Sequence, residues 1–152
     1  MHNNENSFKG VTEQEVKYTM ETQQADLLKT FQNPKMTRDY SIEIEIPEFT
    51  CLCPATGQPD FANIFLFYFP DKLCVELKSL KQYIASFRQV GCYHEDVTNK
   101  LLDDLVALLD PKFMEIYAKF NVRGGTYPKI RCIYKHETWT ADDFPHYFDK
   151  KN

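Results

Sequence analysis

The sequence predicts one α+β domain in which four antiparallel strands carry two helices on one face. Two strand-like segments come first, two helix-like segments follow, and two more strand-like segments come after them, so strands and helices occur in separate runs. One strand is apolar on both faces, a pattern that requires cover on both sides of the sheet. A length of 152 residues suits a single domain with a substantial core.

The first part of the chain contains a polar segment, a short helical pattern and one regular strand. Residues 1–20 are polar, and we expect them to be mobile. Residues 22–31 have helical character, which an Asn-Pro pair ends. In residues 40–47 isoleucines alternate with polar side chains, the pattern of a half-buried strand. We therefore expect a mobile N-terminal segment followed by one domain over residues 21–152.

Phe61 to Phe69 is the strand whose two faces are both apolar. Its phenylalanines share one face with Asn63, and the other face consists of Ala62, Ile64, Leu66 and Tyr68. The two helices can cover only one face of the sheet. The second face then needs another cover, most simply further copies of the chain, so we expect a symmetric homo-oligomer.

Two amphipathic helices follow this strand. The first covers residues 76–89 and ends at Gly91, and the second covers residues 96–109 and ends at Asp110-Pro111. At about 100° per residue, one arc of the first helix is apolar and the neighbouring arc is basic. The apolar arc consists of Leu77, Leu80, Ile84 and Phe87, with Tyr83 at its edge.

A second pair of strands is joined by a tight turn. Residues 113–122 alternate, and residues 127–135 return after the hairpin turn Arg123-Gly124-Gly125. The inward set is Met114, Ile116, Ala118, Phe120 and Val122. The aromatic and charged tail, residues 136–152, predicts no element.

Composition and charge argue against several classes of protein. A formal net charge of −4 is unfavourable for a general nucleic-acid or membrane-surface binder. No run approaches the roughly 18 apolar residues of a membrane helix, and the polar start has no signal-peptide core. We therefore expect a cytoplasmic protein. Five cysteines, an odd number without a secretory signal, favour free thiols, a metal site or catalysis over a disulfide framework.

The stretch from Glu48 to Asp60 is the strongest candidate for a functional loop. Its two prolines restrict the backbone, and Gly57 supplies the freedom that a tight reversal needs. Such a loop can hold a thiol and a carboxyl group at a fixed separation. We therefore expect Cys53 to be a covalent nucleophile and Asp60 its proton-handling partner. The alternative is that Cys53 is a small buried hydrophobe, as most free cysteines are.

A zinc site is the competing chemical reading. Cys51 and Cys53, together with Cys92 and His94, form an acceptable ligand set by type, although a C-x-C spacing is less typical of zinc than C-x-x-C. If zinc bound there, the thiol would not be a free nucleophile.

Other polar groups are candidates for ligand binding. The run His94-Glu95-Asp96 begins the second helix, where a carboxylate could accept two N–H bonds from a heterocycle; the alternative is an ordinary solvated N-terminus. Lys78, Lys81 and Arg123 could bind an anion, or could serve solubility alone. There is no G-x-G-x-x-G motif, so side chains and turn amides would have to hold any nucleotide cofactor.

These motifs resemble the QueF family, the NADPH-dependent 7-cyano-7-deazaguanine reductases of queuosine biosynthesis. The segments that carry the resemblance are EFTCLCPATGQPDFA (48–62), ELKSLKQY (76–83), SFR (86–88), HED (94–96), DP (110–111) and RGG (123–125). They extend over roughly residues 25–135, and the length is similar to that of the short, single-domain branch of the family.

The resemblance implies a fold, an assembly and a reaction. The fold is the tunnelling fold shared with GTP cyclohydrolase I, in which sheets of several subunits close into a barrel. The assembly is a decamer of two stacked pentamers with active sites between subunits. The reaction converts the nitrile of 7-cyano-7-deazaguanine to an aminomethyl group through a Cys53 thioimide, with two NADPH, no metal, and no direct contact with nucleic acid or membrane.

The resemblance also implies roles for individual residues. Cys53 matches the family's nucleophile and Asp60 its proton donor. The substrate-binding positions are Val75, Glu76, Leu77, His94 and Glu95, and the cofactor-binding positions are Leu77, Lys78, Arg123 and Gly124, to which we add Lys81 as an anion-binding candidate. Leu77 departs from the serine of many relatives, so any hydroxyl contact there is lost. Two alternatives stay open, a zinc-dependent cyclohydrolase-like enzyme on the same fold and a non-catalytic pterin- or purine-binding module.

Overall fold

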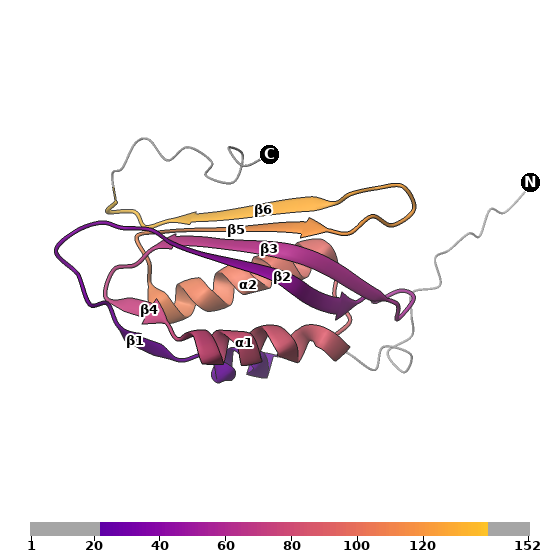
Figure 1. The fold of residues 1–152 in the computed structure, drawn as a ribbon, viewed down its shortest axis with the longest axis horizontal. Helices are drawn as coiled ribbons and strands as arrows, with labels where there is room; N and C mark the ends of the chain where they lie inside the picture. Colours follow the sequence, from indigo (N-terminus) through magenta and orange to yellow (C-terminus); the bar gives the residue numbers. More distant parts are fainter. Residues whose placement is uncertain (1–21, 140–152) are drawn as a thin grey trace, which may run out of the picture.

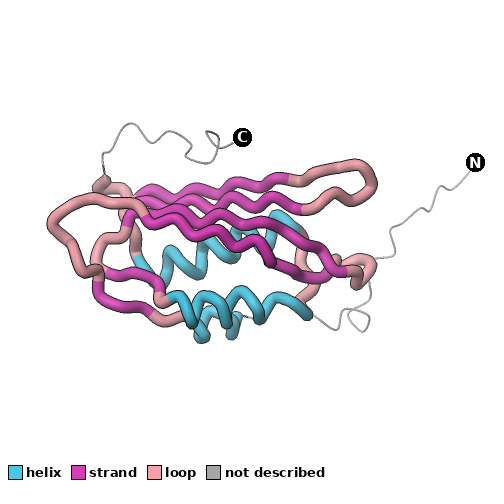
Figure 2. Tube along the Cα trace, in the orientation of Figure 1, coloured by secondary structure: helices cyan, strands magenta, loops and turns pink. Residues whose placement is uncertain are grey.

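Two layers make up the fold in a computed structural model that describes residues 22–139 (Figure 1). A four-stranded antiparallel sheet forms one layer, and two helices on one face of the sheet form the other (Figure 2). In chain order the elements are η1 (Thr22–Leu27), β1 (Thr30–Gln32), β2 (Ile42–Leu52), β3 (Pro59–Phe69), β4 (Leu73–Val75), α1 (Leu77–Ala85), η2 (Ser86–Gln89), α2 (His94–Leu109), β5 (Phe113–Phe120) and β6 (Lys129–Lys135). The expected mobile segment 1–20 and the end of the tail lie outside the described residues.

The sheet has the strand order β2-β3-β5-β6, and every neighbouring pair is antiparallel. β1 and β4 form a separate two-stranded sheet at the end of the molecule where α1 begins (Figure 1). The predicted four-stranded antiparallel sheet with two helices on one face is therefore confirmed.

β3 is apolar on both faces, as the sequence predicts. Its inner face joins the main core with side chains from both helices, and its outer face belongs to a second apolar cluster. The inner face consists of Ala62, Ile64, Leu66 and Tyr68, and the outer cluster consists of Phe67, Phe69, Phe113 and Tyr117 with Phe65 and Trp139 packed against it. Cover of this outer face by further copies of the chain stays a prediction.

The predicted loop from Glu48 to Asp60 is shorter than expected. β2 continues to Leu52 and β3 begins at Pro59, so only residues 53–58 connect them. The strand register shifts between Ile46 and Phe49, around Pro47. A bulge at this point allows a sheet-edge strand to contain a proline without ending. As a result, Asp60 belongs to a strand and pairs in register with Cys51.

Three details of the helical and strand patterns were also wrong. The helical character of residues 22–31 is limited to η1, and Thr30–Gln32 instead pairs with β4, a three-residue strand too short to show a periodic pattern. Leu77 is 52% exposed, because the buried face of the first helix centres on Leu80, Tyr83 and Phe87. Val122 is 50% exposed, because β5 ends at Phe120.

The turn between β5 and β6 has the backbone conformation that its two glycines permit. In the β5–β6 turn Gly124 has φ 57° and Gly125 has φ 76°, and Arg123 bridges Thr126. Positive φ at both central residues is the signature of a type I′ hairpin, so the predicted hairpin is confirmed.

α2 begins at His94, two residues before the predicted start. Within residues 22–139 no helix is both long and apolar enough to cross a membrane.

Candidate active site

The β2–β3 connection fixes Cys53 at the end of β2. The Cys53 N–H donates to the carbonyl of Gln58 at 2.7 Å, and the Gly57 N–H donates to the carbonyl of Cys53 at 2.8 Å. Gly57 has φ 71°, a left-handed conformation that glycine adopts without steric cost. These two bonds close the loop on itself, so the Cys53 side chain projects from a tight and restrained turn.

The same loop stabilises the thiolate form of Cys53. Partial burial raises the pKa of this thiol, but hydrogen bonds to its sulfur from the Thr56 hydroxyl and from the amides of Thr56 and Ala55 outweigh that effect. The nearby Asp60 charge acts in the raising direction. The net pKa of Cys53 is lower than the usual value for a cysteine, which favours the reactive ionised form.

Asp60 lies at the start of β3 between two cationic or basic groups. Its side chain is only 9% exposed. Oδ1 is 3.2 Å from Nη1 of Arg123, and Oδ2 is 3.3 Å from Nε2 of His94. Arg123 also donates to the side-chain carbonyl of Gln58 at 3.1 Å, so the β5–β6 turn is tied to the Cys53 loop. The carboxyl group is therefore held in place from two sides.

A short parallel contact brings the start of α2 beside Cys53. The Leu52 N–H donates to the carbonyl of Val90 at 2.9 Å, and the Cys92 N–H donates to the carbonyl of Leu52 at 3.0 Å. The His94 ring stacks on Phe120, with ring centroids 3.7 Å apart and planes 9° apart. The stacking and the contact with Asp60 together fix the orientation of this imidazole.

These side chains surround one hollow of about 170 Å³. It is lined by Cys53, Pro54, Asp60, Cys92, Tyr93, His94, Glu95 and Arg123. Glu95 is exposed in the first turn of α2, where the helix dipole favours a negative charge. Five of the predicted site residues are thus assembled from three separate parts of the chain. A thiol with a lowered pKa, a buried carboxyl group and an exposed carboxylate that could accept ring N–H groups then lie together.

Gly124 lies next to Arg123 in the β5–β6 turn, whereas the other predicted residues lie on β4 and α1, and α1 begins at the other end of the molecule (Figure 1). Val75 is buried in the main core. Glu76 is the N-cap of α1: its carboxylate accepts from the N–H of Ser79 and from the N–H of Lys78, both at 2.7 Å, and these bonds lower its pKa. α1 with nine residues and η2 with four span about 20 Å between Leu77 and the segment beside Cys53. One chain therefore does not bring the two groups of residues together.

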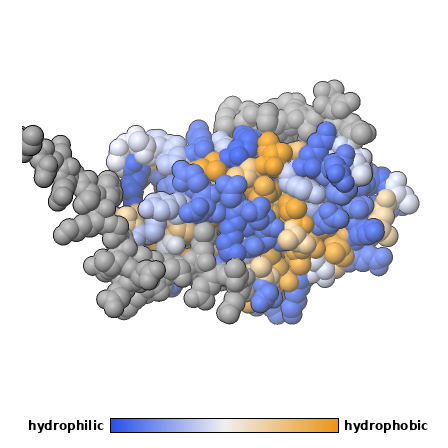
Figure 3. All heavy atoms as spheres, turned by 180° about the vertical axis from the view of Figure 1, so that it is seen from behind, coloured by the Kyte–Doolittle hydropathy of each residue, from blue (hydrophilic) through white to orange (hydrophobic). Residues whose placement is uncertain are grey.

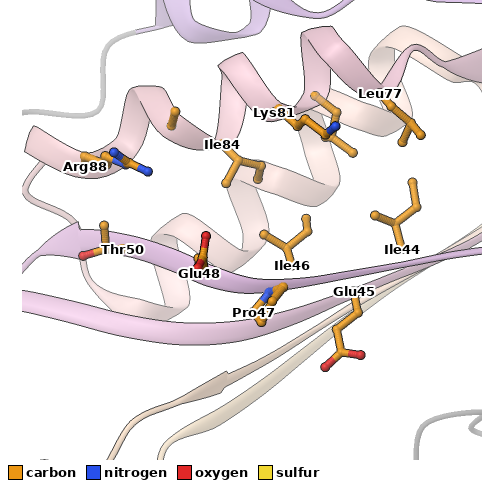
Figure 4. A pocket seen from close by; sticks show the side chains of 12 residues that line it. Ile44, Glu45, Ile46, Pro47, Glu48, Thr50, Leu77, Lys81, Ile84 and Arg88 are labelled. Atoms are coloured by element: carbon orange, nitrogen blue, oxygen red, sulfur yellow. The ribbon is translucent and has the colours of Figure 1, made fainter.

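A groove of about 350 Å³ between β2 and α1 contains part of this second group (Figure 4). Leu77, Leu80 and Ile84 line it from the helix, and Ile44 and Ile46 line it from the strand. Lys81 and Arg88 add two positive charges to its helical wall. The groove therefore combines an apolar lining with two cations, and Glu45 and Glu48 of β2 also line it.

The zinc reading is not supported by how its four residues lie. The Cys51 and Cys92 thiols contact each other in the core, and this contact together with burial raises the pKa of Cys51. Cys53 instead faces its own loop, and His94 faces Asp60. Within residues 22–139 no group of three or more histidine, cysteine or acidic side chains is arranged to hold a metal ion.

Three residues of the site were not predicted from the sequence. Thr56 bonds the Cys53 sulfur, Tyr93 lines the hollow with a ring that is 59% exposed, and Phe120 supports His94. The signal for Thr56 was its position in the loop, three residues after the cysteine. An aromatic residue directly before the His-Glu pair was a signal for Tyr93. No local signal pointed to Phe120, because its contact depends on the pairing of distant strands.

This chain is similar to known proteins over most of its length. A family model described as QueF-like protein matches residues 59–139. The NADPH-dependent 7-cyano-7-deazaguanine reductase of Nitrosococcus oceani is 59% identical over 114 residues, covering 75% of this chain and 88% of that protein. The reductases of that name from Methylobacillus flagellatus and Thioalkalivibrio sulfidiphilus are 58% and 56% identical over 120 residues, covering 79% of this chain and 86% and 93% of theirs.

A solved structure shows the same fold at much lower identity. The archaeosine synthase QueF-Like in its apo form superposes with a TM-score of 0.57 and 17% identity, covering 61% of this chain and 91% of that chain. At this identity the likeness concerns the fold alone.

Proposed function

This chain belongs to the family of the NADPH-dependent 7-cyano-7-deazaguanine reductases, and from that premise we propose that it reduces 7-cyano-7-deazaguanine to 7-aminomethyl-7-deazaguanine. Two NADPH are consumed, and the product serves queuosine biosynthesis in the cytoplasm. The observation that carries the proposal is the hollow in which Cys53, with its lowered pKa, shares the lining with Asp60 and Glu95. Cys53 is the nucleophile and Asp60 the proton donor.

Substrate binding would use the start of α2. The Glu95 carboxylate can accept two N–H bonds from the deazapurine ring, and His94 lies beside it. Holding the ring in this way would place the nitrile carbon within reach of the Cys53 sulfur. Positioning of this kind converts the attack into a step within one complex.

The chemistry begins when the Cys53 thiolate adds to the nitrile carbon. A carbon–sulfur bond forms, one carbon–nitrogen π bond breaks, and the nitrogen takes a proton from Asp60, which gives a covalent thioimide. A nitrile accepts hydride poorly, so the sulfur adduct replaces one difficult step with easier ones. After the first reduction the carbon–sulfur bond breaks and its electrons return to Cys53, leaving an imine. The second reduction and a second proton at nitrogen complete the aminomethyl group.

Asp60 has to deliver protons more than once in this cycle. His94 Nε2 lies 3.3 Å from Oδ2 and can return a proton to it. Arg123 holds the other oxygen and keeps the carboxyl group in position between the steps. A placed general acid accelerates such a reaction by roughly 10²–10⁴-fold.

NADPH, when bound, supplies the hydride for each reduction. The residues present suit a phosphate-bearing cofactor, because Lys78 and Lys81 on α1 have no ion-pair partner among residues 22–139. Leu77 offers an exposed apolar side chain next to them. On the other group of residues, Arg123 and Gly124 lie on the exposed β5–β6 turn and would contact the same cofactor.

We place the complete site between two subunits of a tunnelling-fold decamer. The two groups of site residues lie about 20 Å apart in one chain, so a neighbouring copy would have to unite them. Support for assembly comes from β2 and β6, which are the edge strands of the sheet in this chain. A band of hydrophobic side chains among hydrophilic ones is also exposed on the face seen in Figure 3.

A direct test compares nitrile-dependent oxidation of NADPH by the wild-type protein, by Cys53→Ala and by Cys132→Ala. We expect turnover and 7-aminomethyl-7-deazaguanine, identified by mass spectrometry, from the wild type and from Cys132→Ala only. Cys132 is a suitable control because its thiol lies on β6, outside the hollow. Retained turnover in Cys53→Ala would overturn the assignment of the nucleophile.

A further inference from the structure

The groove between β2 and α1 contains a second cation, Arg88, to which nothing in the proposed reaction assigns a role. Its guanidinium is exposed on η2, just past the end of α1. Figure 4 shows the Arg88 and Lys81 side chains on the helical wall of the groove, above Thr50 and the isoleucines of β2. Arg88 follows Lys81 by seven positions, four along α1 and three along η2, which places the two about 12 Å apart along the helix axis.

Arg88 also lies where two hollows meet. The groove shares Pro47, Glu48, Thr50 and Arg88 with a neighbouring hollow of about 510 Å³. This second hollow is also lined by Phe61, a residue that is 49% exposed, and by Asn121. Arg88 therefore separates an apolar groove from a hollow with an exposed aromatic ring and an amide, two features that can bind a nucleobase.

The positive charge of Arg88 forms no ion pair with the other described residues. Neither Lys81 nor Arg88 forms an ion pair among residues 22–139. Glu45 is turned away from the helix in Figure 4 and accepts a hydrogen bond from Asn63 at 2.7 Å. Glu48 lines the groove but makes no salt bridge with Arg88. The guanidinium is thus available for a ligand, and its fork of donors fits a phosphate in bidentate fashion.

We propose that Arg88 binds the 2′-phosphate of NADPH and sets the preference for NADPH over NADH. The inference rests on the proposed function. Leu77 marks the nicotinamide end of the groove, Lys81 contacts the pyrophosphate, and Arg88 contacts the one phosphate that NADH lacks. The adenine then lies in the hollow beside Phe61. Arg88 is a binding residue with no part in the bond-making steps.

The test measures binding directly, using adenosine 2′,5′-bisphosphate and adenosine 5′-monophosphate as probes of the oligomeric enzyme in titration calorimetry. Loss of a charge-assisted phosphate contact weakens binding by roughly tenfold to 100-fold. We expect Arg88→Gln to show this loss for the bisphosphate and to leave the monophosphate unchanged. Lys81→Gln should weaken both probes. Gln82→Ala, an exposed change on the same helix outside the groove, should weaken neither.

Steady-state kinetics then supply a second readout. Arg88→Gln should reduce the ratio of kcat/KM for NADPH to that for NADH by at least about tenfold, and Arg88→Lys should recover part of the preference. Equal losses for the two probes, or an unchanged cofactor ratio, would overturn the role of Arg88. Thioimide formation from 7-cyano-7-deazaguanine needs no cofactor, so its presence in Arg88→Gln separates a failure of this inference from a failure of the proposed function.

Discussion

The two ends of the molecule differ in how much of a site one chain can build. At the Cys53 end, three distant segments converge, and nearly every polar group has a partner: Asp60 contacts Arg123 and His94, and the Cys53 sulfur receives bonds from its own loop. At the start of α1, Leu77 is exposed and Lys78 has no ion-pair partner among the described residues. At the first end, a single chain organises the side chains into a cluster, whereas at the second end the side chains are exposed at the surface. Under the proposed function, a site that uses both ends would combine residues of two chains.

Replacing Asp60 should produce the largest loss at the organised end. Asp60→Asn keeps the shape and most hydrogen bonds but removes the proton that the nitrile nitrogen needs. We expect turnover to fall by roughly 10²–10⁴-fold, while binding of 7-cyano-7-deazaguanine stays measurable by calorimetry. Asp71→Asn, an acid outside the hollow, is the matched control. A loss of binding as large as the loss of turnover would show that Asp60 holds the substrate and does not act as a general acid.

Mixing two inactive variants tests whether the two ends work across subunits. Cys53→Ala lacks the proposed nucleophile, and Lys78→Glu reverses a charge at the end proposed to bind the cofactor. In hybrid oligomers some sites receive an intact half from each variant, so we expect recovery of up to about a quarter of wild-type turnover at limiting NADPH. The double variant Cys53→Ala/Lys78→Glu, mixed with itself, should recover none.

Native mass spectrometry of the mixture verifies that subunits have exchanged. Exchange without recovery of activity would mean that both ends serve the same subunit, contrary to the 20 Å separation estimated from the length of α1 and η2. Bringing the two ends together in one site would then require a conformational change within one chain in place of a second copy.

Thr56 should have a smaller effect, which appears in the pH dependence. Its hydroxyl bond lowers the pKa of Cys53, so Thr56→Val raises that pKa and leaves less thiolate at neutral pH. We expect the pH profile of Cys53 alkylation by iodoacetamide to move to higher pH, with a severalfold slower rate at pH 7. The shift is limited because two backbone amides still bond the sulfur. An unchanged profile, equal to that of the control Thr30→Val, would show that the Thr56 hydroxyl does not activate the thiol.

Much of the architecture follows from local patterns in the sequence. Strict alternation in β2 and β5 and the double apolar pattern of β3 predicted the sheet, and the apolar arcs predicted both helices. Short or irregular features were not accessible in this way. The bulge around Pro47 extends β2 by several residues, and β1 and β4 are stabilised by each other although neither has a pattern of its own.

Sequence motifs predicted which residues would lie together, and the roles of these residues stay predictions. Cys53, Asp60, His94, Glu95 and Arg123 were expected to act together, and one hollow contains all five. The partners that tune them depend on three-dimensional packing. Phe120 reaches His94 because β5 ends beside the start of α2, and Arg123 reaches Asp60 from the β5–β6 turn. Periodicity along the chain contains no information about such contacts.

Intact-mass spectrometry after mixing the protein with 7-cyano-7-deazaguanine in the absence of NADPH shows whether the sulfur of Cys53 bonds covalently to the nitrile carbon. We expect a gain in mass of one substrate molecule per chain, which peptide mapping assigns to Cys53 and which Cys53→Ala does not show. A chain that binds the nitrile but keeps its original mass would contradict covalent catalysis by this thiol.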